Sequence, residues 1–167
     1  MAKLFLKDLP SEQEIMSSAT SLQAEVDAAA VYTNMLFMKV ATELNNDFDD
    51  VLADYNLSSG RFTLLFLLKN SPEGLMPSEL SAKVGVTQAT ISGLINGLEK
   101  MKLVARHSHE KDGRSFVIKI TPEGESLIAE IFPRWYPRMM SFWSKVSSDE
   151  KSGMNTLLAR MIESKGQ

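Results

Sequence analysis

Short polar side chains recur along one stretch of the chain, and no charged residue interrupts them. The set comprises Thr87, Gln88, Thr90, Ser92 and Asn96. Glutamine and asparagine amides can form paired hydrogen bonds with adenine, and hydroxyl groups can reach phosphates or base edges. These residue types could therefore contact duplex DNA from one helix face, although the same set also suits an ordinary solvated helix face.

A second polar cluster lies between His107 and Arg114, and it carries cations. Lys111 could neutralise a phosphate, and Arg114 is the strongest single candidate because a narrow minor groove attracts an inserted arginine. Asp112 could hold the guanidinium of Arg114 or could only form the turn. The pair His107 and His109 lacks a thiolate partner and is a poor zinc site, so we expect no metal.

Hydrophobic spacing indicates the elements that position these residues. Pro77 opens a short helix through Val84, and Gly85 separates it from a second helix that Thr87 caps. Ser78 lies near the start of the short helix, where a hydroxyl could donate to phosphate. The second helix would bury Ile91, Leu94, Ile95 and Leu98.

Two short strands are expected next, over residues 103–106 and 115–120, with a polar loop over 107–114 between them. A helix-turn-helix followed directly by a hairpin is typical of a winged helix. In that arrangement one helix enters the major groove, and the hairpin lies over the neighbouring backbone or minor groove. The sequence therefore predicts a mainly α fold with a small β-hairpin wing.

Long helices are expected on both sides of this unit. Apolar residues at spacings of three and four predict a helix from Ser21 to about Tyr55, after an arm or short helical turn over residues 11–20. A helix capped by Ser58 or Ser59 should then run to near Asn70.

Beyond the hairpin, Thr121 and Pro122 form a good helix start. Pro133 and Pro137 should kink or break that helix across residues 131–138. Ser147 or Ser148 would cap a final helix. We therefore divide the chain into residues 1–55 (arm and first dimerisation helix), 56–121 (winged helix-turn-helix) and 122–167 (C-terminal dimerisation helices).

Charge is distributed unevenly along the 167 residues, whose net charge is −3. Residues 1–77 carry five basic and eleven acidic side chains, whereas residues 78–121 carry seven basic and four acidic ones. The positive charge thus concentrates around the polar residues described above. No cysteine is present, which excludes disulfides, thiolate sites and thiol redox switches. We find no signal-peptide core and no membrane span, and expect a cytoplasmic protein.

The sequence contains none of the common catalytic or nucleotide-binding motifs, such as GxGxxG, a P-loop, HExxH or GxSxG. Its two histidines share one loop and leave little scope for general acid–base chemistry. We therefore expect neither an enzyme nor a cofactor. The alternative to DNA binding is a winged-helix module that binds only proteins, for which the basic residues Lys111 and Arg114 would have no use.

Several short sequence motifs occur in the central segment in the same order and at the same spacing as in a known protein family. Residues 76–124 resemble the MarR family of bacterial transcriptional regulators: the stretch 86–100 resembles its recognition helix, and Leu103-Val104-x-Arg106 its first wing strand. The wing signature is matched by Asp112-x-Arg114 and by Ile120-Thr121-x-x-Gly124. The layout of flanking helices extends the resemblance over most of the chain.

The resemblance implies a homodimer that binds double-stranded DNA as a repressor. The flanking helices of two subunits would intertwine, and each subunit would place one winged helix on a half-site of a pseudo-palindromic operator. Apolar residues on the long helices agree with this, because they offer more surface than one small subunit easily covers. The other interpretation is that this surface packs inside a monomer.

The resemblance also implies release by a small organic ligand, often an aromatic or phenolic acid, bound between the dimerisation helices and the winged helix. The candidate lining residues are Tyr32, Met35, Met38, Arg61, Phe62, Phe66 and Trp135. Arg61 could pair with a carboxylate. The same apolar stripe would equally form ordinary core.

The recognition helix departs from the family pattern at two positions. Gly93 and Gly97 stand where many members carry arginine or lysine. A glycine inside a helix costs up to ~1 kcal/mol relative to alanine. The two glycines could allow close approach to DNA or could be neutral variation. In either case the helix carries no cation before Lys100, so phosphate neutralisation must come from elsewhere.

Overall fold

Seven helices and one hairpin make up the part of the chain that the computed structural model describes, which is residues 8–22, 25–109 and 112–163, without the side chains of 109 and 112–115. The elements are α1 (Glu12–Ser21), α2 (Ala28–Ala53), α3 (Ser59–Lys69), α4 (Pro77–Val84), α5 (Gln88–Lys100), β1 (Val104–His109), β2 (Asp112–Ile120), α6 (Pro122–Trp143) and α7 (Ser148–Glu163). The mainly α winged-helix fold predicted from the sequence is confirmed.

The helix starts follow local hydrogen bonds that the sequence predicts. The hydroxyl of Ser58 accepts from the amide of Arg61 at the start of α3, and that of Thr87 accepts from the amide of Thr90 at the start of α5. Thr121 caps α6.

At the start of α7 a capping box joins Ser147 and Glu150. The hydroxyl of Ser147 accepts a hydrogen bond from the amide of Glu150, and the carboxylate of Glu150 accepts one from the amide of Ser147. The hydrogen bonds that Ser147 donates to this carboxylate lower the pKa of Glu150.

The first long helix begins later than the sequence predicts. It starts at Ala28 rather than Ser21, because the carboxylate of Asp27 accepts a hydrogen bond from the amide of Ala30 and caps the helix there. The preceding residues form a separate helix, α1, with its own capping box between Ser11 and Glu14. Leu22 and Val26 continue the apolar spacing of α2 beyond its first residue, which concealed this boundary.

The hairpin is longer than predicted, and its loop is correspondingly shorter. β1 and β2 pair antiparallel from Val104 opposite Ile120 outward to His109 opposite Asp112, with an irregularity after Ser108. Most of the expected loop over 107–114 is therefore strand. The polar residues of this segment can form strand, because the hairpin extends away from the core and is held together by hydrogen bonds between the two backbones. Leu75 adds an isolated bridge to Ile118 at the base of the hairpin.

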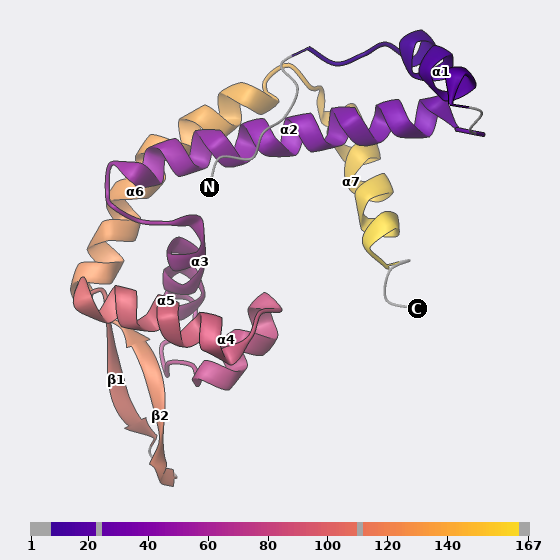
Figure 1. Ribbon diagram of the computed structural model, residues 1–167. Helices are drawn as coiled ribbons and strands as arrows, with labels where there is room; N and C mark the ends of the chain where they lie inside the picture. Colours follow the sequence, from indigo (N-terminus) through magenta and orange to yellow (C-terminus); the bar gives the residue numbers. More distant parts are fainter. Residues whose placement is uncertain (1–7, 23–24, 110–111, 164–167) are drawn as a thin grey trace.

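Of the kink or break predicted across residues 131–138, the structure shows no break. The helix runs without interruption from Pro122 to Trp143, with Pro133 and Pro137 inside it. Its ribbon bends rather than stops (Figure 1). Contacts made between the prolines explain the continuity, since Trp135 packs on Phe48 of α2 with ring centroids 4.8 Å apart. Both prolines lie on the exposed side, where carbonyls that lose their helical partner can bond to water.

Arg134 adds a polar tie between α6 and the end of α2. Its guanidinium lies 2.6 Å from the carboxylate of Asp54 and donates to the hydroxyl of Tyr55 at 3.2 Å. The hydrogen bond to Tyr55 and the contact with Asp54 raise the pKa of Arg134 above its usual value. The pair is largely exposed, so it orients the helices more than it stabilises them.

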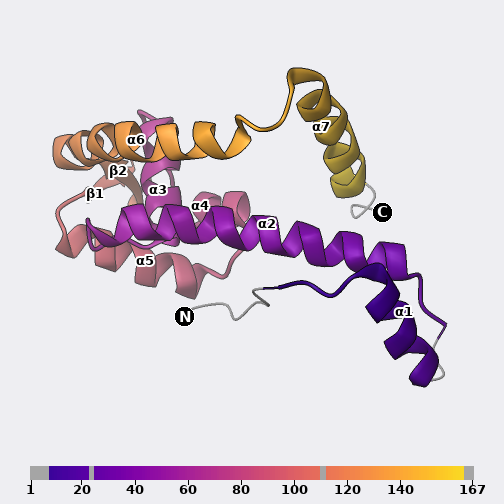
Figure 2. The same cartoon turned by 90° about the horizontal axis from the view of Figure 1, so that it is seen from above.

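One apolar core joins the winged helix to the adjoining ends of the flanking helices. Fully buried side chains come from α2, α3, α4, α5, β2 and α6, namely Leu52, Leu64, Leu65, Leu68, Leu80, Ile91, Ile95, Leu98, Ile118 and Ile131. The wing extends away from this core, whereas α2 and α6 lie beside each other on its other side (Figures 1 and 2).

The flanking helices expose most of the large apolar side chains that the described residues leave in solvent. Thirteen of fifteen lie outside the winged helix, the two exceptions being Phe66 and Val86. No residue of α7 is buried, and Leu157 and Ile162 on it are 52% and 74% exposed. Surface of this kind marks an interface more often than a free face.

Gly124 in the first turn of α6 allows a close backbone contact, which gives a test of this packing. A Cβ at this position would collide with the carbonyl oxygen of Leu103 and lie 2.7 Å from Cγ1 of Ile120. Gly124→Ala should therefore lower the free energy of unfolding by about 1–3 kcal/mol. At Gly93 in α5 a Cβ would meet no described atom within 4 Å outside its chain neighbours and the helix backbone, so Gly93→Ala should instead raise the free energy of unfolding by up to ~1 kcal/mol. Urea unfolding at one protein concentration measures both, and equal stability of the two variants would contradict the contact.

Candidate nucleic-acid interface

The polar face of α5 points into solvent because its opposite face is anchored. Ile91, Ile95 and Leu98 are each at most 2% exposed. The polar residues predicted to contact DNA are all exposed: Thr87, Gln88, Thr90, Ser92 and Asn96. The structure therefore brings this predicted set together on one accessible helix surface of the kind that fits a major groove.

The beginning of α5 is held in a defined geometry. The Thr87 and Thr90 hydroxyl oxygens lie 2.9 Å apart, so each already has a partner when the helix is capped. Gly85 adopts φ +72° in the preceding turn, a conformation that favours glycine. The Ser81 hydroxyl donates to the carbonyl of Val86 and ties α4 to that turn. Gln88 and Ser92 make no hydrogen bond to another described side chain and remain available for DNA.

Asn96 lies in a small network with the wing. Its Oδ1 accepts a hydrogen bond of 2.9 Å from Nη2 of Arg106 on β1, and the same guanidinium lies 3.0 Å from the carboxylate of Glu99. Arg106 also covers the ring of Phe116 at 4.9 Å from its centroid. The network uses Oδ1 of Asn96 and leaves the amide N–H groups of this residue free to donate to another partner. Sequence reasoning did not find this coupling, because it depends on the hairpin folding back on α5.

The remaining predicted DNA contacts are only partly described. Ser78 is accessible at the second position of α4, as expected. Asp112 and Arg114 lie in β2, but their side chains are outside the described part of the structure, and Lys111 is outside the described residues altogether. Their roles remain predictions. His107 is exposed on β1, and the side chain of His109 is not described.

The residues predicted to line a ligand site fall into separate places. An aromatic chain runs from Phe66 through Phe62 and Phe48 to Trp135, with neighbouring ring centroids 6.4, 5.0 and 4.8 Å apart. Phe48, which joins the predicted residues, was not among them. Tyr32, Met35 and Met38 lie on α2 with half-buried or exposed side chains. Arg61 points elsewhere, against Gly97 of α5.

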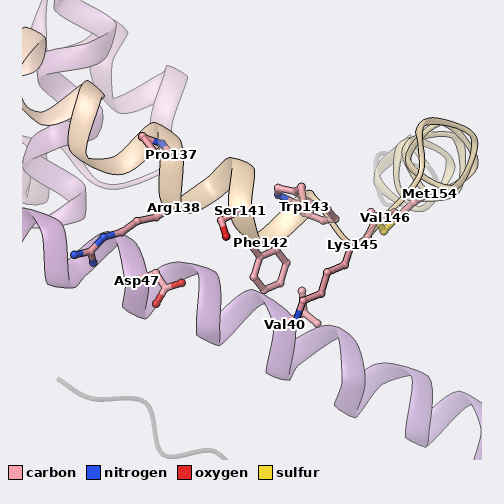
Figure 3. A pocket seen from close by; sticks show the side chains of 10 residues that line it. All are labelled: Val40, Asp47, Pro137, Arg138, Ser141, Phe142, Trp143, Lys145, Val146 and Met154. Atoms are coloured by element: carbon pink, nitrogen blue, oxygen red, sulfur yellow. The ribbon is translucent and has the colours of Figure 1, made fainter.

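Two adjoining cavities lie between α2 and α6. The larger, of about 910 Å³, extends to the start of α7, and its lining includes Val40, Phe142 and Met154 (Figure 3). The smaller, of about 180 Å³, is lined by Leu44, Asn45, Asp47, Phe48, Trp135, Arg138, Met139 and Trp143. Of the seven residues predicted for a ligand site, Trp135 lines one of these two cavities. Arg138 lines both and makes no ion pair with a described residue.

Membrane spans and metal clusters are both absent from the described ranges. None of the helices there is long and apolar enough to cross a membrane. No group of three or more histidine, aspartate or glutamate side chains that could hold a metal occurs in the same ranges.

Comparison with known proteins decides the family. Residues 55–115 match the model of the MarR family. The transcriptional repressor YetL of Bacillus subtilis is 29% identical over 159 residues, which is 95% of each chain. Residues 55–115 therefore form a MarR-family domain. Members of this family are transcriptional regulators, so the protein is a winged helix-turn-helix regulator of transcription and not an enzyme, as the sequence predicts.

Solved structures of the same fold include two that carry ligands. The Staphylococcus aureus MepR–DNA complex has a TM-score of 0.70 at 23% identity, covering 78% of this chain and 94% of MepR. CouR from Rhodococcus jostii RHA1, bound to p-coumaroyl-CoA, also has a TM-score of 0.70, at 21% identity, covering 81% of this chain and 95% of CouR. These similarities confirm the winged-helix architecture over the central and flanking helices.

Proposed function

We propose that this protein is a homodimeric, ligand-released repressor that binds a pseudo-palindromic operator through α5 and the wing. The observation that carries the proposal is the uninterrupted, exposed polar face of α5 beside a hairpin whose sequence contains Lys111 and Arg114. A module that binds only proteins would not need this combination. The solved MepR–DNA complex supports DNA as the partner.

Helix and wing divide the recognition of DNA in this proposal. From Thr87 to Gly97 the helix offers amides and hydroxyls but no charge, so it discriminates bases and adds little Coulomb attraction. The wing supplies affinity, because Lys111 and Arg114 displace counterions from the phosphates. Asp112 orients Arg114 or closes the turn, and Ser78 donates to a phosphate from the start of α4.

The dimer is formed by the flanking helices. Apolar residues of α2, such as Phe37 and Val40, and of α6, such as Tyr136 and Met140, are exposed in the single chain. A second copy related by a twofold axis would bury them and place two α5 helices on half-sites about one turn, or ~10 bp, apart. The domain division at residues 55 and 121 follows from this arrangement.

The effector is a small aromatic acid held in the smaller cavity. Phe48, Trp135 and Trp143 supply rings for stacking, and Arg138, which extends from α6 toward α2 and makes no ion pair with a described residue, binds the carboxylate (Figure 3). The other residues predicted to line the ligand site would contact the effector from the surrounding helices; they are Tyr32, Met35, Met38, Phe62 and Phe66. The p-coumaroyl-CoA bound by CouR supports an effector of aromatic chemistry.

The division between helix and wing is tested by salt-dependent binding to duplexes selected from a random pool by the wild-type protein. Arg114→Ala should weaken binding to selected and random duplexes and reduce the salt slope by roughly one unit. Gln88→Ala should leave the slope unchanged and cost ~1–3 kcal/mol on the selected duplex only. If the folded Arg114→Ala variant keeps the affinity and salt slope of wild type, the wing does not supply the affinity for DNA. Failure of the wild type to bind any duplex would favour the protein-interaction module.

The dimer is tested by placing a charge in the exposed apolar face. Phe37 is 53% exposed in the single chain, so Phe37→Asp should leave the subunit folded but place an unpaired carboxylate in the interface. Sedimentation equilibrium at micromolar concentration should show a dimer for wild type and a monomer for Phe37→Asp. Val86→Asp, in the turn before α5, is the matched control and should stay dimeric. A monomeric wild type, or a dimeric Phe37→Asp, would contradict the interface.

The effector site can be followed by fluorescence, because both tryptophans of the chain, Trp135 and Trp143, line the smaller cavity. Titration with 4-hydroxybenzoate should quench their emission to saturation. Arg138→Gln should raise the Kd by roughly tenfold or more, since it removes a charge-assisted hydrogen bond. Arg160→Gln on α7 is the charge-matched control and should leave the Kd unchanged. The same Kd for Arg138→Gln and wild type would exclude Arg138 as the carboxylate partner.

A further inference from the structure

Gly97 of α5 lies directly beneath a guanidinium from another helix. A Cβ built on Gly97 would lie 2.6 Å from Nη2, 2.7 Å from Nε and 2.8 Å from Cζ of Arg61. These distances are shorter than real Cβ atoms tolerate, and all three atoms belong to one planar group. The guanidinium of Arg61 therefore occupies the space that a side chain at position 97 would need.

The approach of α3 to α5 explains how Arg61 comes to this position. Ser58 caps α3, and a Cβ built on Gly60 at its start would lie 3.6 Å from the Leu94 side chain of α5, so the two helices are close there. Arg61 follows Gly60, and Gly97 lies one helical turn after Leu94. The arginine thus extends along the flank of α5. Apart from its chain neighbours and the backbone of α5 itself, no described atom lies within 4 Å of a Cβ at Gly93, one turn earlier, so this part of the helix is open to solvent.

Arg61 also differs from the other arginine beside α5 in its partners. The guanidinium of Arg106 is neutralised by Glu99 and bonded to Asn96. The guanidinium of Arg61 makes no ion pair or hydrogen bond with any described residue, although its side chain is half-buried. Guanidinium is weakly hydrated and tolerates partial burial, and its planar fork matches the geometry of a phosphate.

We propose that Arg61 is the phosphate-binding cation of the recognition helix, supplied by α3 across Gly97. Its ligand is a backbone phosphate of duplex DNA at the edge of the major groove that α5 enters. The inference rests on the proposed function and deepens it. It accounts for the uncharged stretch from Thr87 to Gly97, because a neighbouring helix supplies the cation that α5 lacks. It also explains the glycine at position 97, where any side chain would displace the guanidinium of Arg61.

Arg61→Gln tests the charge directly on a random-sequence 30-bp duplex. Affinity near physiological salt should fall about tenfold, and the salt slope should drop by about one unit, as for one lost phosphate contact. Lys69→Gln removes the same charge at the other end of α3, about 12 Å along the helix, and should leave the slope unchanged. Thermal melting of both variants checks that they fold.

Gly97→Ala tests the placement of the guanidinium. The added Cβ must displace Arg61 while favouring the helix, so the variant should fold normally and lose affinity and slope as Arg61→Gln does. The double variant should lose no more than either single one, because both changes remove the same contact. Arg61→Lys should retain much of the slope.

The outcomes separate this inference from the proposed function. If wild type binds the duplex and Arg61→Gln matches its affinity and slope, the inference is overturned and the proposed function stands. The inference is equally overturned if Arg61→Gln lowers only the melting temperature, which would show a packing role, or alters only the response to 4-hydroxybenzoate, which would show a ligand role. If wild type binds no duplex, the proposed function fails and the inference fails with it.

Discussion

Burial of the apolar stripe of α5 is the constraint on which the interface depends. Ile91, Ile95 and Leu98 enter a core shared with α3 and β2, and removing each side chain from water contributes roughly 1.5–3 kcal/mol. A helix has one orientation that buries this stripe. Once it is adopted, Gln88, Ser92 and Asn96 must face outward, so the same packing that stabilises the fold also aligns the residues predicted to contact DNA.

That core does not stop at the limits of the winged helix. Leu52 near the end of α2 and Ile131 in α6 are fully buried in it, and the ion pair of Arg134 with Asp54 crosses the same junction. The orientation of the DNA-binding unit is therefore set by how α2 and α6 pack. The smaller cavity lies between these two helices. A molecule bound there would act on the contacts that position α5, which couples the proposed effector site to the operator.

Electrostatics in this protein is local rather than global. The chain is acidic overall, and its recognition helix is uncharged through most of its length. One neighbouring arginine, Arg106, is neutralised by Glu99 and orients Asn96, whereas another, Arg61, lies against Gly97 with no described partner. Two residues of the same type thus serve different purposes beside one helix, and their partners, rather than the net charge, distinguish them.

The sequence by itself determined the features that depend on near neighbours in the chain. Thr87, Thr121 and Ser58 cap helices because a hydroxyl bonds an amide three residues away, and the stripe of α5 follows from the helical period. The recognition helix, the hairpin after it and the family were therefore predictable. The start of α2 was missed although its cause is also local, because the apolar spacing outweighed the capping residue Asp27.

Tertiary structure alone decided the features in which distant residues meet. Contacts of Trp135 and Arg134 with α2 keep α6 continuous through two prolines, against the local preference. The bond from Arg106 to Asn96 requires the hairpin to fold beside α5. The guanidinium of Arg61 reaches Gly97 only because α3 crosses α5 at Gly60. Sequence spacing determines which face of an element is apolar, but only packing determines which element that face meets, since contact depends on the shapes of both.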